Sequence, residues 1–398
     1  MGKVYYFIYN ERPMSPLFKS QVLPLLIRAS KEQSVCLVYF TQFWFNFKFK
    51  NNLRELNKLS YLHNFNLKLY PFAVPERMSQ FFLIEFLSKK IFKKILCRLL
   101  KNHSVKVIHA RGYIASFYLS TLKNKFDFKF IFDGRSLYPY EGITRGLWTK
   151  KSKAFNSWKN KEKKILKNSD YTICINQEIK DYYDSIILKN NIVIPLMYSF
   201  RDDKILSSKL IELKNRCSNK NVFIYSGSLM LNFWNDLDLY TRYFIKIRKA
   251  DKDSFFIIAT NSNHEFILNY LQRNGLNKSS FFLLNASKNE LKELYNISKF
   301  GLQLMPELPD GFSRLGVKTI EYLFNDLIVM VNDNCGSAKN LVINNNHGFV
   351  LNLDDSAFEK KYHESIKRPY NNRKKKFTEF SEDSVLSKYE KLYKILCA

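Results

Sequence analysis

Residues 305–323 combine a loop rich in Pro, Gly and Ser with the start of a helix and two basic side chains. The helix is expected to begin close to Gly316, with Ser313 as its N-cap. Arg314 and Lys318 then lie in or beside the first turn, where the helix dipole disfavours cations unless an anion binds there. A helix N-terminus after a glycine-containing loop is a common phosphate site. The stretch therefore predicts a pocket for a phosphate-bearing ligand.

Two further features belong with this pocket. Glu321 lies within one turn of Lys318 and can accept hydrogen bonds from ligand hydroxyls. The small-residue turn Ser226-Gly227-Ser228 follows an apolar strand and lets the backbone approach a ligand closely. The alternatives are an ordinary loop-to-helix junction with solvated charges and an ordinary strand-to-loop turn, and the residues alone leave both open.

Charged residues of the first half follow two other apolar strands. His109 and Arg111 follow one strand, and Asp133 and Arg135 follow the next, with Glu141 nearby. Such a mixed-charge set could bind a sugar or a phosphate, or act as acid and base. The alternatives are that Asp133 pairs with Arg135 or caps the next helix, and that His109 is a core residue.

No metal or cofactor is expected. The triplet Asp236-Leu237-Asp238 fits the D-x-D pattern of metal–diphosphate sites, but one such triplet is expected by chance, and the helix dipole favours acids in a first turn. The six histidines show no ligand spacing, and the six cysteines form no C-x-x-C pair. The cysteines are expected to be reduced and mostly buried.

Short β-rich runs alternate with helical patterns along the whole chain, which predicts parallel sheets wrapped by helices. The expected strands are Val4–Tyr9, Val35–Phe40, Leu67–Phe72, Val105–Ala110, Phe128–Phe132, Tyr171–Ile175, Ile192–Leu196, Val222–Tyr225, Phe255–Ala259, Phe281–Leu284, Phe300–Met305, Leu327–Val331 and Phe349–Leu353. The expected helices are Phe18–Ala29, Phe81–Leu100, Ile114–Leu122, Ala154–Asn168, Leu237–Ile247, Glu265–Leu271, Lys288–Ile297, Val317–Phe324, Ala338–Ile343 and Ser381–Leu396. The polar run Ser199–Lys204 separates two such series. Open α/β sheets bind ligands at the carboxyl ends of their strands, so two halves imply a cleft.

Length, composition and net charge limit the number of domains and the classes of partner. The 398 residues favour two domains, and 46% apolar residues are ample for their cores. A net charge of +28 indicates attraction to nucleic acid, to an anionic membrane surface or to phosphorylated ligands. No nucleic-acid-binding signature accompanies the charge.

Two stretches of the sequence contain basic residues that suggest how the net positive charge could be used. In the run Phe81–Lys101, basic residues Lys89, Lys90, Lys93, Lys94, Arg98 and Lys101 fall on one helical face and bulky apolar residues on the other. Such a helix suits an anionic membrane interface, but it also fits a sheet-packing helix with a solvated basic face. The aromatic run Phe43–Lys50 is expected to be an interfacial loop or an edge strand. No signal peptide, membrane span or myristoylation site is expected.

The combined pattern resembles bacterial glycosyltransferases of the GT-B fold, family 4 type. The resemblance is carried by F-S-R-x-G-x-K-x-x-E-Y-L at Phe312–Leu323, followed by Asn332, Gly336 and Gly348. Glu321 matches the second of the family's two glutamates, which holds the nucleotide ribose. Ser313 stands where the family has the first, and Phe324-Asn325-Asp326 replaces the family's small-residue turn. The charged residues of the first half, with Trp148, resemble an N-terminal pattern of polysaccharide-assembly transferases.

The resemblance implies site residues in both halves. The donor-binding residues would be Gly227, Ser228, Ser313, Arg314, Gly316, Lys318 and Glu321. The catalytic residues would be His109, Arg111, Asp133, Arg135 and Glu141.

It also implies an α/β fold of two Rossmann-like domains facing across a cleft. Residues 1–198 would bind the acceptor, residues 199–370 would bind a nucleotide sugar, and residues 371–398 would form a helix packing back towards the first domain. The reaction would be metal-independent and would retain the configuration at the sugar C1. The acceptor would be a saccharide or a lipid-linked saccharide in surface polysaccharide biosynthesis (O-antigen, capsule or lipopolysaccharide). The expected location is cytoplasmic, on the inner face of the membrane. A sugar-nucleotide epimerase and a nucleic-acid-binding protein are the alternatives.

Overall fold

The computed structural model describes residues 3–42, 47–73, 82–101, 105–198, 208–370 and 377–397. It divides into two compact units: unit 1 joins Met1–Ser199 to Glu379–Ala398, and unit 2 is Phe200–Thr378. The chain leaves and re-enters unit 1 at a parallel bridge between Tyr198 and Ser381. The Tyr198 amide donates to the Phe380 carbonyl at 2.8 Å, which pins the two crossing segments together.

Unit 1 contains a parallel sheet of seven strands in the order β3-β2-β1-β4-β5-β6-β7. Its strands are β1 (Lys3–Tyr9), β2 (Ser34–Phe40), β3 (Asn66–Tyr70), β4 (Val107–Arg111), β5 (Lys129–Asp133), β6 (Tyr171–Cys174) and β7 (Asn191–Val193). The strand order reverses between β1 and β4, which is the arrangement of a doubly wound sheet. Strands buried on both faces read as continuous apolar runs, and this is why the sequence marks them so clearly.

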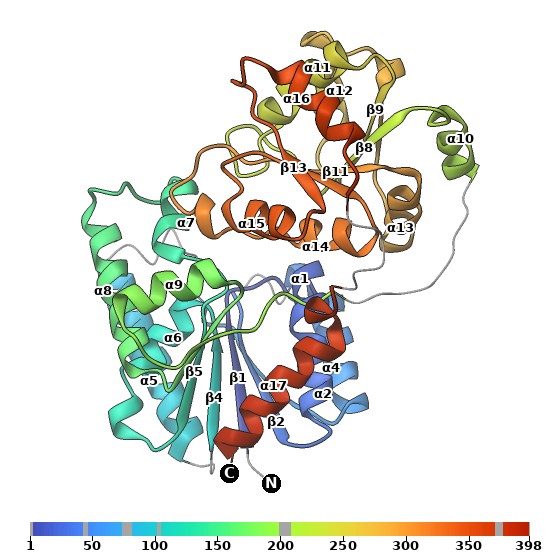
Figure 1. Ribbon diagram of the computed structural model, residues 1–398. Helices are drawn as coiled ribbons and strands as arrows, with labels where there is room; N and C mark the ends of the chain where they lie inside the picture. The colour runs from blue at the N-terminus through green and yellow to red at the C-terminus, as the bar shows by residue number, and fades with distance from the viewer. Residues whose placement is uncertain are drawn as a thin grey trace. The chain divides into compact units, whose positions relative to one another are not determined.

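Helices cover both faces of this sheet (Figure 1). They are α1 (Pro16–Gln21), α2 (Leu23–Ala29), α4 (Lys50–Leu62), α5 (Phe82–Lys101), α6 (Tyr113–Ser120), α7 (Tyr138–Thr144), α8 (Lys153–Asn168), α9 (Gln177–Ile186) and α17 (Glu382–Cys397). Helix α17 packs against α2 and β4, and its apolar residues join the core of this unit. Helix α6 packs between α5 and α8.

Unit 2 repeats the pattern with a six-stranded parallel sheet in the order β10-β9-β8-β11-β12-β13. Its strands are β8 (Asn221–Ser226), β9 (Ser254–Ala259), β10 (Phe281–Leu284), β11 (Phe300–Gln303), β12 (Ile328–Val331) and β13 (Gly348–Val350). Its helices are α10 (Ser208–Arg216), α11 (Leu237–Ala250), α12 (His264–Arg273), α13 (Lys288–Ile297), α14 (Val317–Phe324), α15 (Gly336–Asn344) and α16 (Phe358–Lys367). The order reverses between β8 and β11, so the carboxyl ends of these two strands mark the expected ligand edge.

The structure corrects several sequence-based boundaries. The helix expected over Phe18–Ala29 is two helices, because Pro24 has no N–H for the helical ladder and the chain breaks at Val22. Helices α4, α7, α9, α10 and α16 were not predicted. All the expected strands are present within a few residues.

Several predictions fall on residues that are not described. Phe43–Asn46, Phe81, the link Ser199–Lys204 and the first residues of the expected C-terminal segment, 371–376, lie outside the described residues. Phe47 and Lys48 are helical, so an edge strand over Phe43–Lys50 is wrong for that part. No helix in the described part of the chain is both long and apolar enough to cross a membrane. All six cysteines are unpaired, and four of them are buried.

Candidate functional site

Lys318 is the centre of a basic site at the carboxyl edge of the unit 2 sheet. It lies in the first turn of α14, whose N-cap is Gly316, a residue with no side chain to satisfy the first amides. Lys318 Nζ donates to Asn235 Oδ1 at 3.0 Å and lies 4.1 Å from the centre of the Tyr225 ring. A Cβ built on Gly227 would lie 3.4 Å from the same nitrogen. The ammonium therefore lies between the end of β8 and the start of α14.

The environment of Lys318 favours an incoming anion. Burial lowers the pKa of Lys318 to about 7, because the ammonium loses much of its hydration. The first turn of α14 contains no acidic residue, and the nearest carboxylate with an effect on the ammonium, Glu321, offsets only part of this loss. A phosphate placed here would stabilise the charged form and would also meet the positive end of the helix dipole.

A nucleotide sugar, the ligand that the family resemblance implies for this site, should bind here with an affinity that depends on pH. Below about pH 7, Lys318 is charged before and after binding; above it, binding must first take up a proton, so affinity should fall by up to about tenfold per pH unit towards pH 9. A nucleotide sugar has no titrating phosphate proton in that range. Calorimetry across this range tests the expectation. In Lys318→Arg the dependence should disappear, because guanidinium stays charged; a slope that persists in this variant contradicts the assignment.

The turn after β8 is shaped by backbone geometry. Gly227 has a φ of 132°, a conformation that side chains rarely adopt. Its amide donates to the Ala259 carbonyl at 2.9 Å, so this N–H continues the sheet. The Ser226 amide donates to the Tyr322 hydroxyl at 3.0 Å, and the Tyr225 hydroxyl donates to the Ser228 carbonyl at 2.7 Å. These bonds fix the turn beside Lys318.

Glu321 lies one turn further along α14. Its Oε2 accepts from the Tyr295 hydroxyl at 3.0 Å, and Tyr295 also lies 3.1 Å from the Ser226 hydroxyl. Burial raises the pKa of Glu321 above its ordinary value. A partly buried carboxylate held in this way can accept hydrogen bonds from ligand hydroxyls, which is the chemistry expected of it from the sequence.

Arg314 and Ser313 differ from their predicted surroundings. Arg314 Nη2 lies 2.8 Å from Asp310 Oδ2, and its guanidinium lies 4.8 Å from the centre of the Trp234 ring. Ser313 closes a short 3-10 turn, and its hydroxyl donates to the Asp310 carbonyl at 2.9 Å. The prediction that Ser313 caps α14 is therefore wrong, because the cap is Gly316.

In unit 1, the structure brings His109, Arg111, Asp133 and Arg135 together at the ends of β4 and β5. Asp133 is fully buried and lies 3.3 Å from His109 Nε2, 2.8 Å from Arg135 Nε and 3.8 Å from Arg111 Nη1. Burial alone raises the pKa of Asp133, but its cationic and hydrogen-bonding neighbours lower it to about 2. The carboxylate therefore stays charged at neutral pH.

The neighbours of this carboxylate also have partners of their own. Burial lowers the pKa of His109, so the ring is neutral; Nε2 donates to Asp133, and Nδ1 accepts from the Tyr393 hydroxyl at 2.7 Å. Arg135 donates to the Tyr389 hydroxyl at 2.7 Å. Both tyrosines belong to α17. His109 thus lies in a core network, which is one of the alternatives that the sequence left open, and its catalytic role stays a prediction.

The remaining charged candidates lie beside this network. Arg111 Nε donates to Glu11 Oε1 at 2.7 Å. Glu141 accepts from the Ser136 hydroxyl at 2.7 Å and lies 3.9 Å from Arg145. The roles expected of Arg111, Arg135 and Glu141 stay predictions too.

The acidic triplet caps a helix, as expected. Asp236 is the N-cap of α11 and accepts from the Asp238 amide at 3.3 Å. Asp238 pairs with Arg242 at 2.9 Å and accepts from the Tyr270 hydroxyl at 2.8 Å. Among the described residues, no group of three or more His, Cys, Asp and Glu side chains is arranged to hold a metal ion.

Sequence reasoning missed several partners of the site. Asn235 and Trp234 follow the Gly227 turn, and an aromatic pair beside Asn in a strand-to-helix loop was an available signal. Asp310, Tyr295 and the tyrosines of α17 gave no signal, because their role depends on contacts made across the fold.

No family model and no curated protein matches the chain. Solved structures do match over the whole chain. Sucrose-phosphate synthase from Thermosynechococcus elongatus has a TM-score of 0.68 and 12% identity, covering 100% of this chain and 99% of that one. A glycosyltransferase from Rickettsia africae has a TM-score of 0.65 and 15% identity, covering 99% and 98%. Anabaena HepE in complex with UDP has a TM-score of 0.67 and 10% identity, covering 99% and 100%.

At such identities the likeness shows the fold and leaves the type 4 family a prediction. The chain has the predicted α/β fold of two Rossmann-like units, the GT-B class to which these solved structures belong.

Proposed function

We propose that the protein is a glycosyltransferase that takes a sugar from a nucleotide donor bound to unit 2. The observation that carries the proposal is the Lys318 ammonium at the start of α14, beside the Gly227 turn. The fold adds support, because one solved structure of this fold is in complex with UDP and another is bound with UDP-2-fluoro glucose.

The chemistry follows from where charge develops. The bond between the sugar C1 and the diphosphate oxygen breaks, and its electron pair stays on the leaving diphosphate. An acceptor hydroxyl oxygen bonds to C1, and its proton passes to the leaving group. Lys318, Arg314 and the start of α14 would stabilise the developing negative charge, while Glu321 would hold donor hydroxyls. Retention of configuration is the outcome that the family resemblance implies.

We assign the acceptor to unit 1, at the carboxyl ends of β4 and β5, where open α/β sheets bind ligands. Arg111 and Arg135 lie there. The proposed acceptor is a saccharide, or a lipid-linked saccharide, in surface polysaccharide biosynthesis on the inner face of the membrane.

Helix α5 supports the membrane part of this proposal, but through other side chains than those of its buried apolar face. The sequence left two places open for the apolar face of α5, a membrane or the sheet. The ring centre of Phe92, on that face, lies 4.4 Å from that of Phe40 and 4.7 Å from that of Tyr118, so the face covers the sheet. Phe86, Leu87 and Ile91 remain 43–50% exposed, next to the exposed basic residues of the same helix. These three side chains are the proposed membrane contact.

Binding and turnover test the function. Calorimetry with UDP and with a panel of nucleotide sugars should give a Kd below about 1 mM, the usual upper range for enzyme substrates. Release of nucleoside diphosphate that depends on an added saccharide acceptor supports transfer. Conversion of the sugar without any acceptor would favour the epimerase instead, and absence of all nucleotide binding would overturn both.

Glu321→Ala is expected to weaken the binding of UDP and of the nucleotide sugar alike, by at least about tenfold. A lost hydrogen bond to a charged acceptor costs about 1.5–3 kcal/mol. Calorimetry of both ligands measures the loss. Glu293→Ala, on the neighbouring helix α13, is the matched control and should bind normally. Unchanged UDP affinity in Glu321→Ala would argue against a role in holding the nucleotide.

A further inference from the structure

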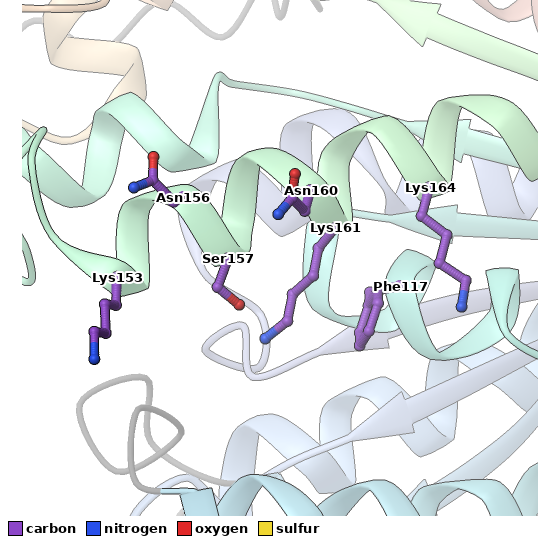
Figure 2. Close-up of a pocket in the computed structure, with 7 residues that line it drawn as sticks. All are labelled: Phe117, Lys153, Asn156, Ser157, Asn160, Lys161 and Lys164. Carbon is purple, nitrogen blue, oxygen red and sulfur yellow. The ribbon is translucent and has the colours of Figure 1, made fainter.

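A groove with no role in the proposed chemistry lies on unit 1, between α8 and Phe117 of α6 (Figure 2). Its volume is about 510 Å³. Lys153, Lys161 and Lys164 supply its cations, and they share one face of α8 because they are separated by about two turns and one turn. Asn156, Ser157 and Asn160 lie along the same face.

The charge of the groove is not neutralised from within its helix. Glu162, the acid in the sequence of α8, is fully buried and faces inward. Its carboxylate accepts from the Tyr113 hydroxyl at 2.7 Å and from the Tyr182 hydroxyl at 2.8 Å, and it pairs with Lys159. The solvent-facing side of α8 is therefore basic.

Phe117 connects this groove to α5. Lys161 Nζ from α8 lies 5.2 Å from the centre of the Phe117 ring, and Lys89 Nζ from α5 lies 5.9 Å from it. Two helices thus place ammonium groups over one aromatic ring. Leu87 and Ile91 are exposed on the same helix as Lys89, so α5 presents both apolar and basic side chains to solvent.

We infer that this groove binds the phosphate of an anionic phospholipid headgroup at a membrane surface. The lysine ammonium groups can pair with the phosphate charge, and the side-chain amides and the serine hydroxyl can hydrogen-bond to headgroup hydroxyls. The exposed apolar side chains of α5 can contact the acyl boundary of the membrane. A nucleic acid would use aromatic rings as stacking platforms, whereas Phe117 already carries two ammonium groups. The inference rests on the proposed membrane location. It adds a headgroup-binding site on α8 to the apolar membrane contact proposed for α5.

The test is co-sedimentation of the full-length chain with phosphatidylcholine vesicles, with and without phosphatidylglycerol. The groove variant is Lys153→Glu, Lys161→Glu and Lys164→Glu together. The control is Lys31→Glu, Arg54→Glu and Lys58→Glu, which makes the same change in net charge at exposed residues after α2 and on α4, on the other side of unit 1 (Figure 1).

The groove variant should lose at least about tenfold more vesicle binding than the control, because each basic side chain at an anionic surface adds to the attraction. Both variants should keep the thermal unfolding profile and the nucleotide-sugar affinity of the parent chain.

If the groove variant and the control lose vesicle binding equally, the vesicles are attracted by the overall positive charge of the chain and not by the groove, and the inference is overturned. Binding lost in Leu87→Glu with Ile91→Glu, but retained in the groove variant, would also overturn it while leaving the membrane contact of α5 in place. Groove-dependent retention of RNA with no vesicle binding would assign the groove to nucleic acid instead. A parent chain that binds no vesicles overturns the groove and the membrane location together, and the donor-binding experiments still decide the transferase proposal separately.

Discussion

Lys318→Ala is expected to lower the turnover of the nucleotide sugar by at least about tenfold and by up to about 1000-fold, the upper value found when one donor to a developing anion is removed. The reason is specific to the transition state. In the proposed reaction, negative charge grows on the leaving diphosphate while the bond to C1 breaks, and the ammonium lies at the start of α14 with no acid in the first turn. The low dielectric that lowers the pKa of Lys318 also strengthens its attraction to that charge.

Steady-state kinetics with the identified donor measure this effect. Lys318→Arg keeps the charge and should recover part of the turnover, whereas Lys249→Ala, an exposed lysine of α11, should behave as the parent chain. Near-normal turnover in Lys318→Ala would show that Lys318 does not stabilise the leaving diphosphate. A loss that appears only in KM would mean that Lys318 binds the donor without stabilising the transition state.

Asp133→Ala is expected to lower the free energy of unfolding by about 3–5 kcal/mol, the usual cost of breaking a buried ion pair. The carboxylate is fully buried and partners Arg135, His109 and Arg111. Without it, two largely buried guanidinium groups remain, and Glu11 pairs with Arg111 alone. The cost comes from stranding those charges, since the pair itself gains little over apolar packing.

Urea denaturation followed by circular dichroism measures the change. Asp127→Ala removes an exposed aspartate just before β5 and should stay within about 0.5 kcal/mol of the parent. The sign of the pH dependence is also fixed. Because the pKa of Asp133 is depressed to about 2 in the folded chain, its contribution is present above the ordinary aspartate pKa and is lost as pH falls towards 2. A loss below 1 kcal/mol in Asp133→Ala would show that the network is not a stabilising unit.

The central strands could be predicted because each is a short apolar run buried on both faces. The site around α14 was partly predictable for a similar reason: Gly316, Lys318 and Glu321 lie within two turns, so local spacing reports their arrangement. The partner of Lys318 was not predictable, because Asn235 lies 83 residues earlier in the chain. Contacts of that kind are set by the order of strands, which the sequence does not state directly.

The charged cluster of unit 1 shows the same limit more strongly. The sequence placed His109, Arg111, Asp133 and Arg135 at one edge of a sheet, and the structure confirms that placement. Their chemistry could not be predicted, because the Tyr393 hydroxyl that occupies His109 Nδ1 lies 284 residues away. A histidine that reads as a candidate catalyst is then a neutral member of a buried network.

The bridge between Tyr198 and Ser381 makes unit 2 an insertion within unit 1. Because the outgoing and returning segments are hydrogen-bonded to each other, unit 1 needs no more than a short loop to close over the excised segment. With this arrangement, unit 2 could be replaced by another domain as one continuous segment without interrupting the fold of unit 1. A homologous unit spliced between these two positions would meet the same pair of anchors. Under the proposed function, recombination could then replace the donor preference while the core that includes α17 stays intact.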